Sequence, residues 1–275
     1  MRVTMLVVAG VTAALSSMLR LPIADGAIDA PEVVTLPPHS LLYPLPGEFT
    51  RDGKTEAAPT RELHPRALAI MRRQVTAAEY RRCVDDHGCP AVPGLADDRN
   101  RPAVKVSWRD ATAYAAWLSR RLGATYRLPT DEEWAFAAGN RFTPTATPAR
   151  GDNPGEIALR RYEMEEAAAD VEAEPRPIGS FGANENGVLD LAGNVSEWTD
   201  TCYRHIEINA VGATPVVNCG IRVVEGRHRG YLPDFIRDAR AGGCSVGRPP
   251  ANLGFRLIWE ESREELAAER SGELS

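Results

Sequence analysis

Cys244 is the residue whose type and surroundings most directly suggest chemistry. It lies between Arg240 and Arg248, and positive charge near a thiol lowers its pKa and favours the reactive thiolate. We therefore expect Cys244 to act as a redox nucleophile or a cofactor ligand, with Arg240 beside it in a catalytic site. Two structural alternatives stay open: a disulfide with Cys202 or Cys219, and a buried small apolar side chain.

A histidine within a basic run is the second catalytic candidate. His228 lies between Arg227 and Arg229 and is predicted to be an acid–base group, with a solvated basic surface as the alternative. Residues 222–256 hold seven arginines and three acidic residues. This excess predicts a cleft for an anionic or peptide substrate, although a surface balanced by the acidic stretch 163–174 fits equally well. The candidate substrate-binding residues are Arg237, Arg248 and Arg256.

The other four cysteines are predicted to form two disulfides. Cys83 and Cys89 lie six residues apart across a His-Gly turn, and Cys202 and Cys219 bracket a loop-like stretch. Two bridges and one free thiol are the simplest arrangement for five cysteines in an exported chain, with five buried thiols as the alternative. No Cys-x-x-Cys motif or spaced histidine pair occurs in the sequence, so a zinc site is not expected.

Composition places the chain among ordinary globular proteins. Of its 275 residues, 43% are apolar and 25% are charged, which excludes a polytopic membrane protein, a fibrous repeat and a wholly disordered chain. The formal net charge is −6. No nucleic-acid partner is expected, because binding through general charge needs a basic surface.

The first 27 residues are predicted to be a signal peptide. Arg2 precedes an apolar stretch that runs to Leu19, and small residues follow at Ala24, Gly26 and Ala27, a pattern typical of secretion. The apolar stretch is short for a bilayer span, so no stable membrane span is expected after the signal is removed. We expect export, with the periplasm as the compartment.

Three further segments and three helices are predicted. The segments are an extended lead-in over residues 28–39, one domain over residues 40–260 and a polar tail over residues 261–275. The helices are indicated by capping boxes, in which an N-cap hydroxyl and an acidic residue three positions later exchange hydrogen bonds with the backbone. The boxes are Thr76 with Glu79, Ser107 with Asp110 and Thr130 with Glu133, and the glycines predicted to end the helices are Gly88, Gly123 and Gly139.

Four sequence blocks in a fixed order carry a resemblance to a known family. They are VTAAEY at 75–80, PAVKVSWRDA at 102–111, YRLPTDEEW at 126–134 and NGVLDLAGNVSEW at 186–198, followed by RAGG at 240–243 and NLGFR at 252–256. From about residue 40 to residue 259 the chain resembles the formylglycine-generating enzyme, or sulfatase-modifying factor, superfamily. The resemblance implies an α+β fold in a single domain, a variant of the C-type lectin fold with little regular secondary structure.

The fourth block also suggests a calcium site. A glycine-enabled turn at Gly193 exposes carbonyls beside the side-chain oxygens of Asn194 and Glu197, and hard oxygen ligands suit Ca²⁺. The resemblance implies the same structural ion, held by the backbone carbonyls of Gly193, Asn194 and Val195 and by the carboxylate of Glu197. The alternative is a capped turn in which Glu197 binds backbone N–H groups.

The sequence departs from the family where the chemistry is expected. Formylglycine-generating enzymes bind copper(I) through two cysteines after this Gly-Gly segment, as soft thiolates favour that ion. Here Cys244 stands at the family's serine position, the following stretch to Asn252 is shorter, and the pair is absent. Copper is therefore not expected, and the identity of any catalytic metal is left open.

The absence of the cysteine pair changes the function that we expect. The run around residues 227–238 resembles the pyoverdine-maturation (PvdO-like) subgroup, which also lacks the pair and is implicated in oxidising the chromophore of a peptide siderophore. We expect an exported oxidoreductase that acts on a peptide or peptide-derived small molecule. The alternatives are a non-catalytic lectin-like binding module and a true formylglycine-generating oxidase with another thiol arrangement.

Overall fold

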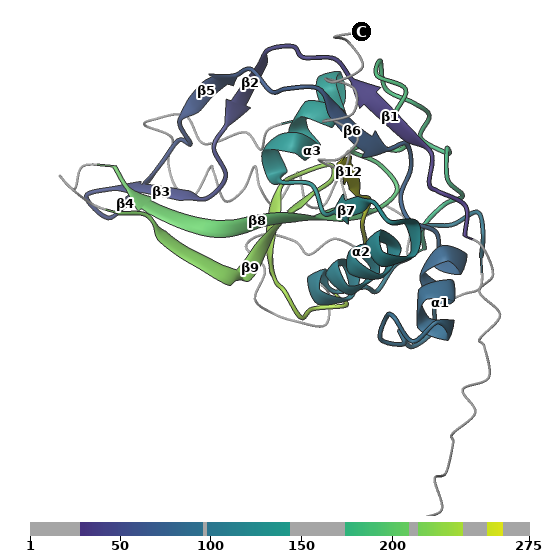
Figure 1. The fold of residues 1–275 in the computed structure, drawn as a ribbon. Helices are drawn as coiled ribbons and strands as arrows, with labels where there is room; N and C mark the ends of the chain where they lie inside the picture. Colours follow the sequence, from purple (N-terminus) through teal and green to yellow (C-terminus); the bar gives the residue numbers. More distant parts are fainter. Residues whose placement is uncertain (1–27, 96–97, 144–173, 209–213, 239–251, 261–275) are drawn as a thin grey trace, which may run out of the picture.

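The computed structural model describes residues 28–95, 98–143, 174–208, 214–238 and 252–260 (Figure 1). Within these residues, two larger sheets and one short sheet are combined with three helices. The first sheet has the order β1-β6-β12-β7, and the second has the order β10-β9-β8-β3-β4, with β11 beside β8. The third is the β2-β5 pair. The predicted α+β fold in a single domain is confirmed.

The strands are short apart from one long hairpin. The hairpin strands are β8 (Ser196–Glu207) and β9 (Val216–Glu225). The other strands are β1 (Val33–Leu36), β2 (Leu41–Pro44), β3 (Glu48–Arg51), β4 (Lys54–Glu56), β5 (Thr60–Leu63), β6 (Leu68–Met71), β7 (Thr125–Arg127), β10 (Gly230–Pro233), β11 (Leu253–Gly254) and β12 (Ile258–Glu260). The helices are α1 (Ala77–Asp85), α2 (Trp108–Leu122) and α3 (Asp131–Ala138), which leads into a short 3-10 helix, η1 (Gly139–Arg141).

All three predicted capping boxes are present. In each, the N-cap hydroxyl accepts from the backbone N–H three residues later, and the acidic side chain at that position accepts from the N-cap N–H. Gly123 ends α2 in the left-handed region with φ 68°, and Gly139 ends α3 with φ 54°. The prediction for α1 was wrong at its end. That helix stops at Asp85, and His87, with φ 57°, makes the turn in place of Gly88.

The lead-in is part of the fold. Residues 33–36 form β1, which pairs antiparallel with β6 in the register Val33↔Met71 to Leu36↔Leu68. Pro31 and Pro37 flank β1 and are compatible with a strand at the edge of a sheet. Leu36 is 1% exposed, so this segment contributes to the core.

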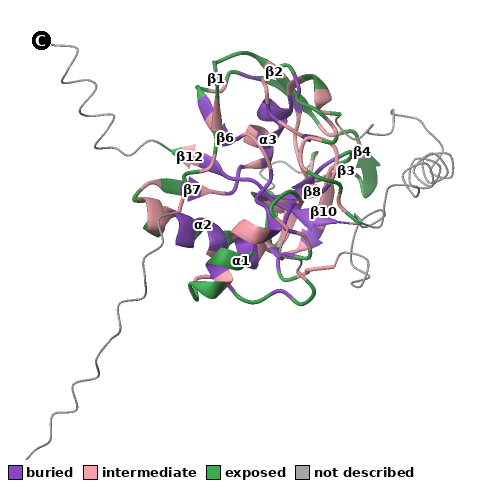
Figure 2. Ribbon diagram, turned by 90° about the vertical axis from the view of Figure 1, so that its right-hand side faces the viewer, coloured by how far each residue is buried: buried purple, intermediate pink, exposed green. Residues whose placement is uncertain are grey.

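Helix α3 lies inside the molecule (Figure 2). Six of its eight residues are buried, and Trp134 and Phe136 pack in one cluster with Ile70 of β6. Helices α1 and α2 cover another cluster, in which Tyr80, Tyr114 and Phe255 are in ring contact. Because α3 is enclosed at its first residue as well, its N-terminus brings a carboxylate into the interior.

Both predicted disulfides are formed. Cys83 is bonded to Cys89 across the end of α1, and Cys202 of β8 is bonded to Cys219 of β9. The second bridge joins the two strands of the long hairpin at a register shift between Cys202 and Tyr203. Four of the five cysteines of the chain are thereby paired.

Candidate functional site

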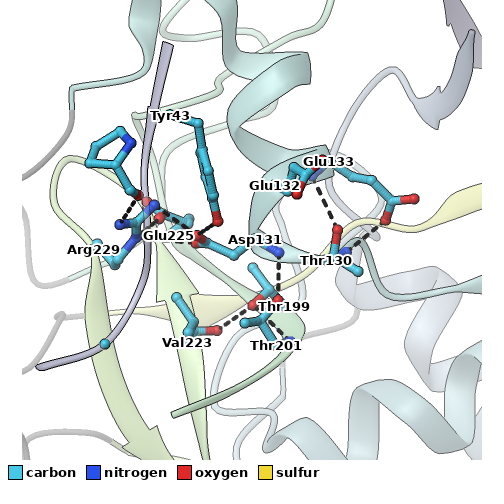
Figure 3. Close-up of polar contacts among 12 residues, drawn as sticks. Tyr43, Thr130, Asp131, Glu132, Glu133, Thr199, Thr201, Val223, Glu225 and Arg229 are labelled. Carbon is cyan, nitrogen blue, oxygen red and sulfur yellow. Dashed lines mark hydrogen bonds and ion pairs between the residues drawn. The ribbon is translucent and has the colours of Figure 1, made fainter. Parts of the chain in front are cut away.

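The most unusual group of side chains is a buried cluster of two acids, one arginine and one tyrosine (Figure 3). Asp131 is the first residue of α3, Glu225 is the last residue of β9, Arg229 precedes β10, and Tyr43 lies in β2. We call these four residues the acid–arginine cluster. It joins α3 to two of the three sheets.

Arg229 is the centre of the acid–arginine cluster. Its Nη2 lies 2.7 Å from Oδ2 of Asp131, and its Nε donates to Oε1 of Glu225 at 2.7 Å. Its Nη1 donates to the carbonyl of Pro44 at 2.9 Å. The Tyr43 hydroxyl donates to Asp131. The side chains of Asp131 and Glu225 are 0% and 2% exposed, so the charges interact away from solvent.

Burial changes the titration of this cluster. Removal from water and the adjacent charge of Asp131 raise the pKa of Glu225 well above its usual range, and Arg229 offsets only part of that rise. Burial would lower the pKa of Arg229, but the two carboxylates outweigh it and raise it. Burial and Asp131 also raise the pKa of Tyr43. The ionised form of Glu225 is therefore disfavoured in this cluster.

A chain of threonines fixes the start of α3. The N–H of Asp131 donates to the hydroxyl of Thr201 at 2.8 Å, and the N–H of Thr201 donates to the hydroxyl of Thr199 at 3.3 Å. Thr199 in turn donates to the carbonyl of Val223 in β9 at 2.8 Å. The orphan N–H at the helix start is satisfied by the neighbouring sheet, which sets Asp131 opposite the end of β9.

A second enclosed ion pair lies at the fourth sequence block. Nε of Arg256 donates to Oε2 of Glu197 at 2.6 Å, and Nη2 donates to Oε1 at 2.7 Å. Gln74 and Trp134 donate to the same two oxygens at 2.8 and 2.9 Å. The remaining N–H groups of Arg256 reach backbone carbonyls of Met71, Arg72 and Leu189.

These contacts decide whether the predicted calcium ligands fit an ion. A carboxylate offers about four lone-pair directions, and donors of the protein use four at Glu197. Asn194 accepts from the N–H of Arg176 at 2.8 Å, and the Gly193 carbonyl accepts from the N–H of Val195 at 2.7 Å. Glu197 therefore does not fit the role of calcium ligand that the resemblance implies for it, and the rest of the calcium site stays a prediction.

Most arginines of the basic stretch that the structure describes are paired with acids from other elements. Arg237 holds Asp110 through contacts of 2.7 and 2.8 Å. Arg222 donates to Asp200 at 3.0 Å and lies over the ring of Trp108, 3.9 Å from its centroid. Arg256 is 0% exposed. These contacts give Arg237 and Arg256, the two described candidates for substrate binding, a role in holding the fold.

The catalytic candidates are only partly described. His228 is exposed on the turn before β10, directly beside Arg229. Partial burial of its ring and the charge of Arg227 lower the pKa of His228, so the neutral imidazole is favoured. Cys244, Arg240 and Arg248 lie outside the described residues, as do the predicted signal peptide and the polar tail. Their roles stay predictions.

Sequence reasoning did not find the acid–arginine cluster. Asp131 belongs to the third sequence block and Glu225 and Arg229 to the basic stretch, but the first reads as a helix start and the others as surface charges. The sequence did contain one signal: Glu225 ends an apolar run that predicts a strand, and it lies four residues before Arg229. Nothing local indicated that both would face Asp131.

Comparisons with known proteins agree on one family. Residues 27–261 match the family described as the sulfatase-modifying factor enzyme 1-like domain. A formylglycine-generating enzyme of Mycobacterium tuberculosis is 31% identical over 300 aligned positions, which cover 79% of this chain and 97% of the relative. The inactive C-alpha-formylglycine-generating enzyme 2 of Mus musculus is 36% identical over 187 positions, which cover 60% of this chain and 56% of the relative.

A solved structure supports the fold. The structure of PvdO from Pseudomonas aeruginosa matches 84% of this chain and 95% of its own with a TM-score of 0.54, at 23% sequence identity. At this identity the likeness concerns the fold alone. Among the described residues, no helix is long and apolar enough to cross a bilayer.

Proposed function

The chain belongs to the sulfatase-modifying factor family, and on that premise we propose that it is an exported maturation enzyme that oxidises a peptide or peptide-derived substrate. The proposal differs from formylglycine generation in its chemistry. It assigns the reaction to Cys244 and His228 and uses no pair of copper-binding thiolates.

The count of cysteines carries this proposal. The chain has five, and the two disulfides use Cys83, Cys89, Cys202 and Cys219. Cys244 is left as the single thiol. A copper(I) site built from two thiolates within one chain therefore lacks its second ligand, which separates this protein from the copper-dependent chemistry that the family resemblance implies.

Two observations support export and the kind of substrate. Disulfides form and persist mainly in oxidising compartments, and this chain has two. The fold resemblance to PvdO, together with the shared lack of the cysteine pair, favours a peptide-derived substrate over a sulfatase. Calcium is no part of the proposed chemistry, because Glu197 is saturated by donors.

Oxygen consumption tests the proposal. The purified chain, after export, is supplied with a peptide that carries a reduced, oxidisable aromatic chromophore or with a cysteine-containing peptide. We expect uptake with the first peptide, loss of that uptake in Cys244→Ser, and no formylglycine in the second. Formylglycine production, or tight copper(I) binding that depends on Cys244 alone, would instead return the chain to the copper-dependent group.

A non-catalytic binding module is the second candidate function. The similarity to a mouse relative described as inactive favours it, because a family scaffold can keep a binding surface after losing its chemistry. This candidate predicts saturable binding of the same chromophore peptide by calorimetry, with no oxygen uptake and no change in the peptide mass. Cys244→Ser would leave that affinity unchanged.

A further inference from the structure

We propose that Asp131 and Glu225 share one proton in the folded protein, and that the resulting neutral acid–arginine cluster is a pH-sensitive latch. The latch fastens the turn that carries His228 to α3 and to the end of β2. It is independent of the proposed oxidation, since it concerns the scaffold and none of its members is assigned to the substrate.

The charge balance of the cluster motivates the proposal. Each packed element contributes as follows: Tyr43 comes from β2, Asp131 from α3, Glu225 from β9, Arg229 from the turn and Tyr231 from β10. Strand β8 offers the uncharged Thr199 and Thr201 and also Glu197, the register partner of Glu225, which forms its own ion pair with Arg256. Within the part of the chain that the structure describes, Arg229 is the one cation in contact with both acids. With both acids ionised, the buried cluster would carry an unpaired negative charge.

An unpaired buried charge is costly, and a buried acid usually takes up a proton instead. A proton placed between the two carboxyls leaves one carboxylate opposite one guanidinium. Nε of Arg229 donates to Oε1 of Glu225 at 2.7 Å and to Oδ1 of Asp131 at 3.3 Å, so the two carboxyls meet at one N–H group, where a proton can be held between them. The cluster is then neutral and every close contact is favourable.

The surroundings assign the proton to Glu225. Asp131 is the first residue of α3, where the helix dipole stabilises a negative charge, and it also accepts from the Tyr43 hydroxyl. Glu225 ends a strand and lacks that dipole. We therefore assign the proton to Glu225. Arg229 then forms an ion pair with Asp131 and donates a hydrogen bond to the neutral Glu225.

The latch connects segments that are distant in sequence. Arg229 reaches the carbonyl of Pro44 at the end of β2, and the hydroxyl of Tyr231 accepts from the N–H of Gly47 at 2.7 Å. Both contacts hold the chain directly after His228. Ionisation of Glu225 would set a second negative charge against Asp131, draw Arg229 away from Pro44 and loosen the turn.

The direction of the pH effect follows from the pKa of Glu225, which folding raises. Between the pKa values of the unfolded and folded states, the folded state binds more protons, so stability falls as pH rises. The contribution of Glu225 is thus greatest at acidic pH and is lost as pH rises through the folded value. An amide at this position keeps the shape and removes the titration.

Infrared spectroscopy tests the shared proton directly. At about pH 7, far above the ordinary pKa of a carboxyl, we expect a protonated-carboxyl C=O band in the wild type and its loss in Glu225→Gln. Asp131→Asn should also remove the band, because Glu225 would then ionise to pair with Arg229. Glu132→Gln, an exposed neighbour on α3, should keep it. A wild type without the band, or a band that persists in Glu225→Gln, overturns the proposal.

Thermal unfolding tests the latch. From about pH 6 to about pH 9, above the range of an unperturbed carboxyl, the melting temperature should fall less in Glu225→Gln than in the wild type or in Glu132→Gln. Equal slopes in all three proteins contradict a latch. Where Glu225→Gln does not fold, titration of the wild-type band with pH decides the question. A band that does not disappear together with the solvent protection of the amides of residues 230–232 overturns the latch, whatever the outcome of the oxygen assay.

Discussion

The carboxylate of Glu197 and the guanidinium of Arg256 form an ion pair with 0% exposure of either side chain, joined by contacts of 2.6 and 2.7 Å. The pair ties β8 to the segment between β11 and β12, and through Leu189 to the loop before β8. Glu197 is the carboxylate that the family resemblance implied as a calcium ligand. Two experiments follow from this arrangement.

Removing one partner of this pair should destabilise the fold strongly. In Glu197→Gln, Arg256 keeps its charge in an enclosed site without a carboxylate, and breaking a buried pair costs about 3–5 kcal/mol. We expect a loss of that size in the free energy of unfolding, measured by denaturant titration. Glu132→Gln breaks an exposed pair with Arg61 and should cost about 1 kcal/mol or less. Equal effects of the two variants would contradict the enclosed pair.

Calcium removal should leave the fold unchanged. Because donors of the protein saturate Glu197, we expect the melting temperature to be the same before and after treatment with a chelator, and after calcium is restored. An ion that binds only the folded state would raise it. A reversible fall on chelation would show that an ion binds the native chain, and calorimetric titration of Asn194→Ala would then test the loop.

Local features were predictable from the sequence, and pairings between distant segments were not. The three helix starts follow from capping boxes in which the partners are three residues apart. Arg229 and Asp131 are 98 residues apart, and Arg256 and Glu197 are 59 apart. Their meeting depends on how the sheets pack around α3. The sequence alone therefore suggested cationic substrate contacts at Arg237 and Arg256, whereas the fold supplies carboxylates for both.

The pair of Arg237 and Asp110 should make the protein sensitive to acid. Burial alone would raise the pKa of Asp110, but hydrogen bonds from Arg237 and Ser107 outweigh it and lower the value. A carboxyl with a lowered folded pKa contributes stability above its unfolded value of about 3.9, and this is lost as pH falls through the folded value. The side chain of Arg237 is 36% exposed, so solvent screening reduces the contribution.

Arg237→Gln tests this relation. At about pH 7 we expect it to lower the free energy of unfolding by about 1 kcal/mol, the upper range for a partly exposed pair. The difference in the free energy of unfolding between this variant and the wild type should shrink as pH falls through the folded pKa of Asp110. Arg109→Gln, which breaks a more exposed pair with Asp234 on the same side of α2, is the control. A difference that stays constant with pH would show that packing rather than charge is responsible.

The thiol count separates the proposed chemistry from the copper-dependent chemistry. Since four cysteines are paired, unreduced protein in denaturant should present one thiol per chain, and Cys244→Ser should present none. Reduction should release four more. Three or five thiols before reduction would mean that a disulfide is missing, and a second thiolate could then reach a metal. Because the count is made on the denatured chain, its outcome does not depend on how accessible Cys244 is in the folded state.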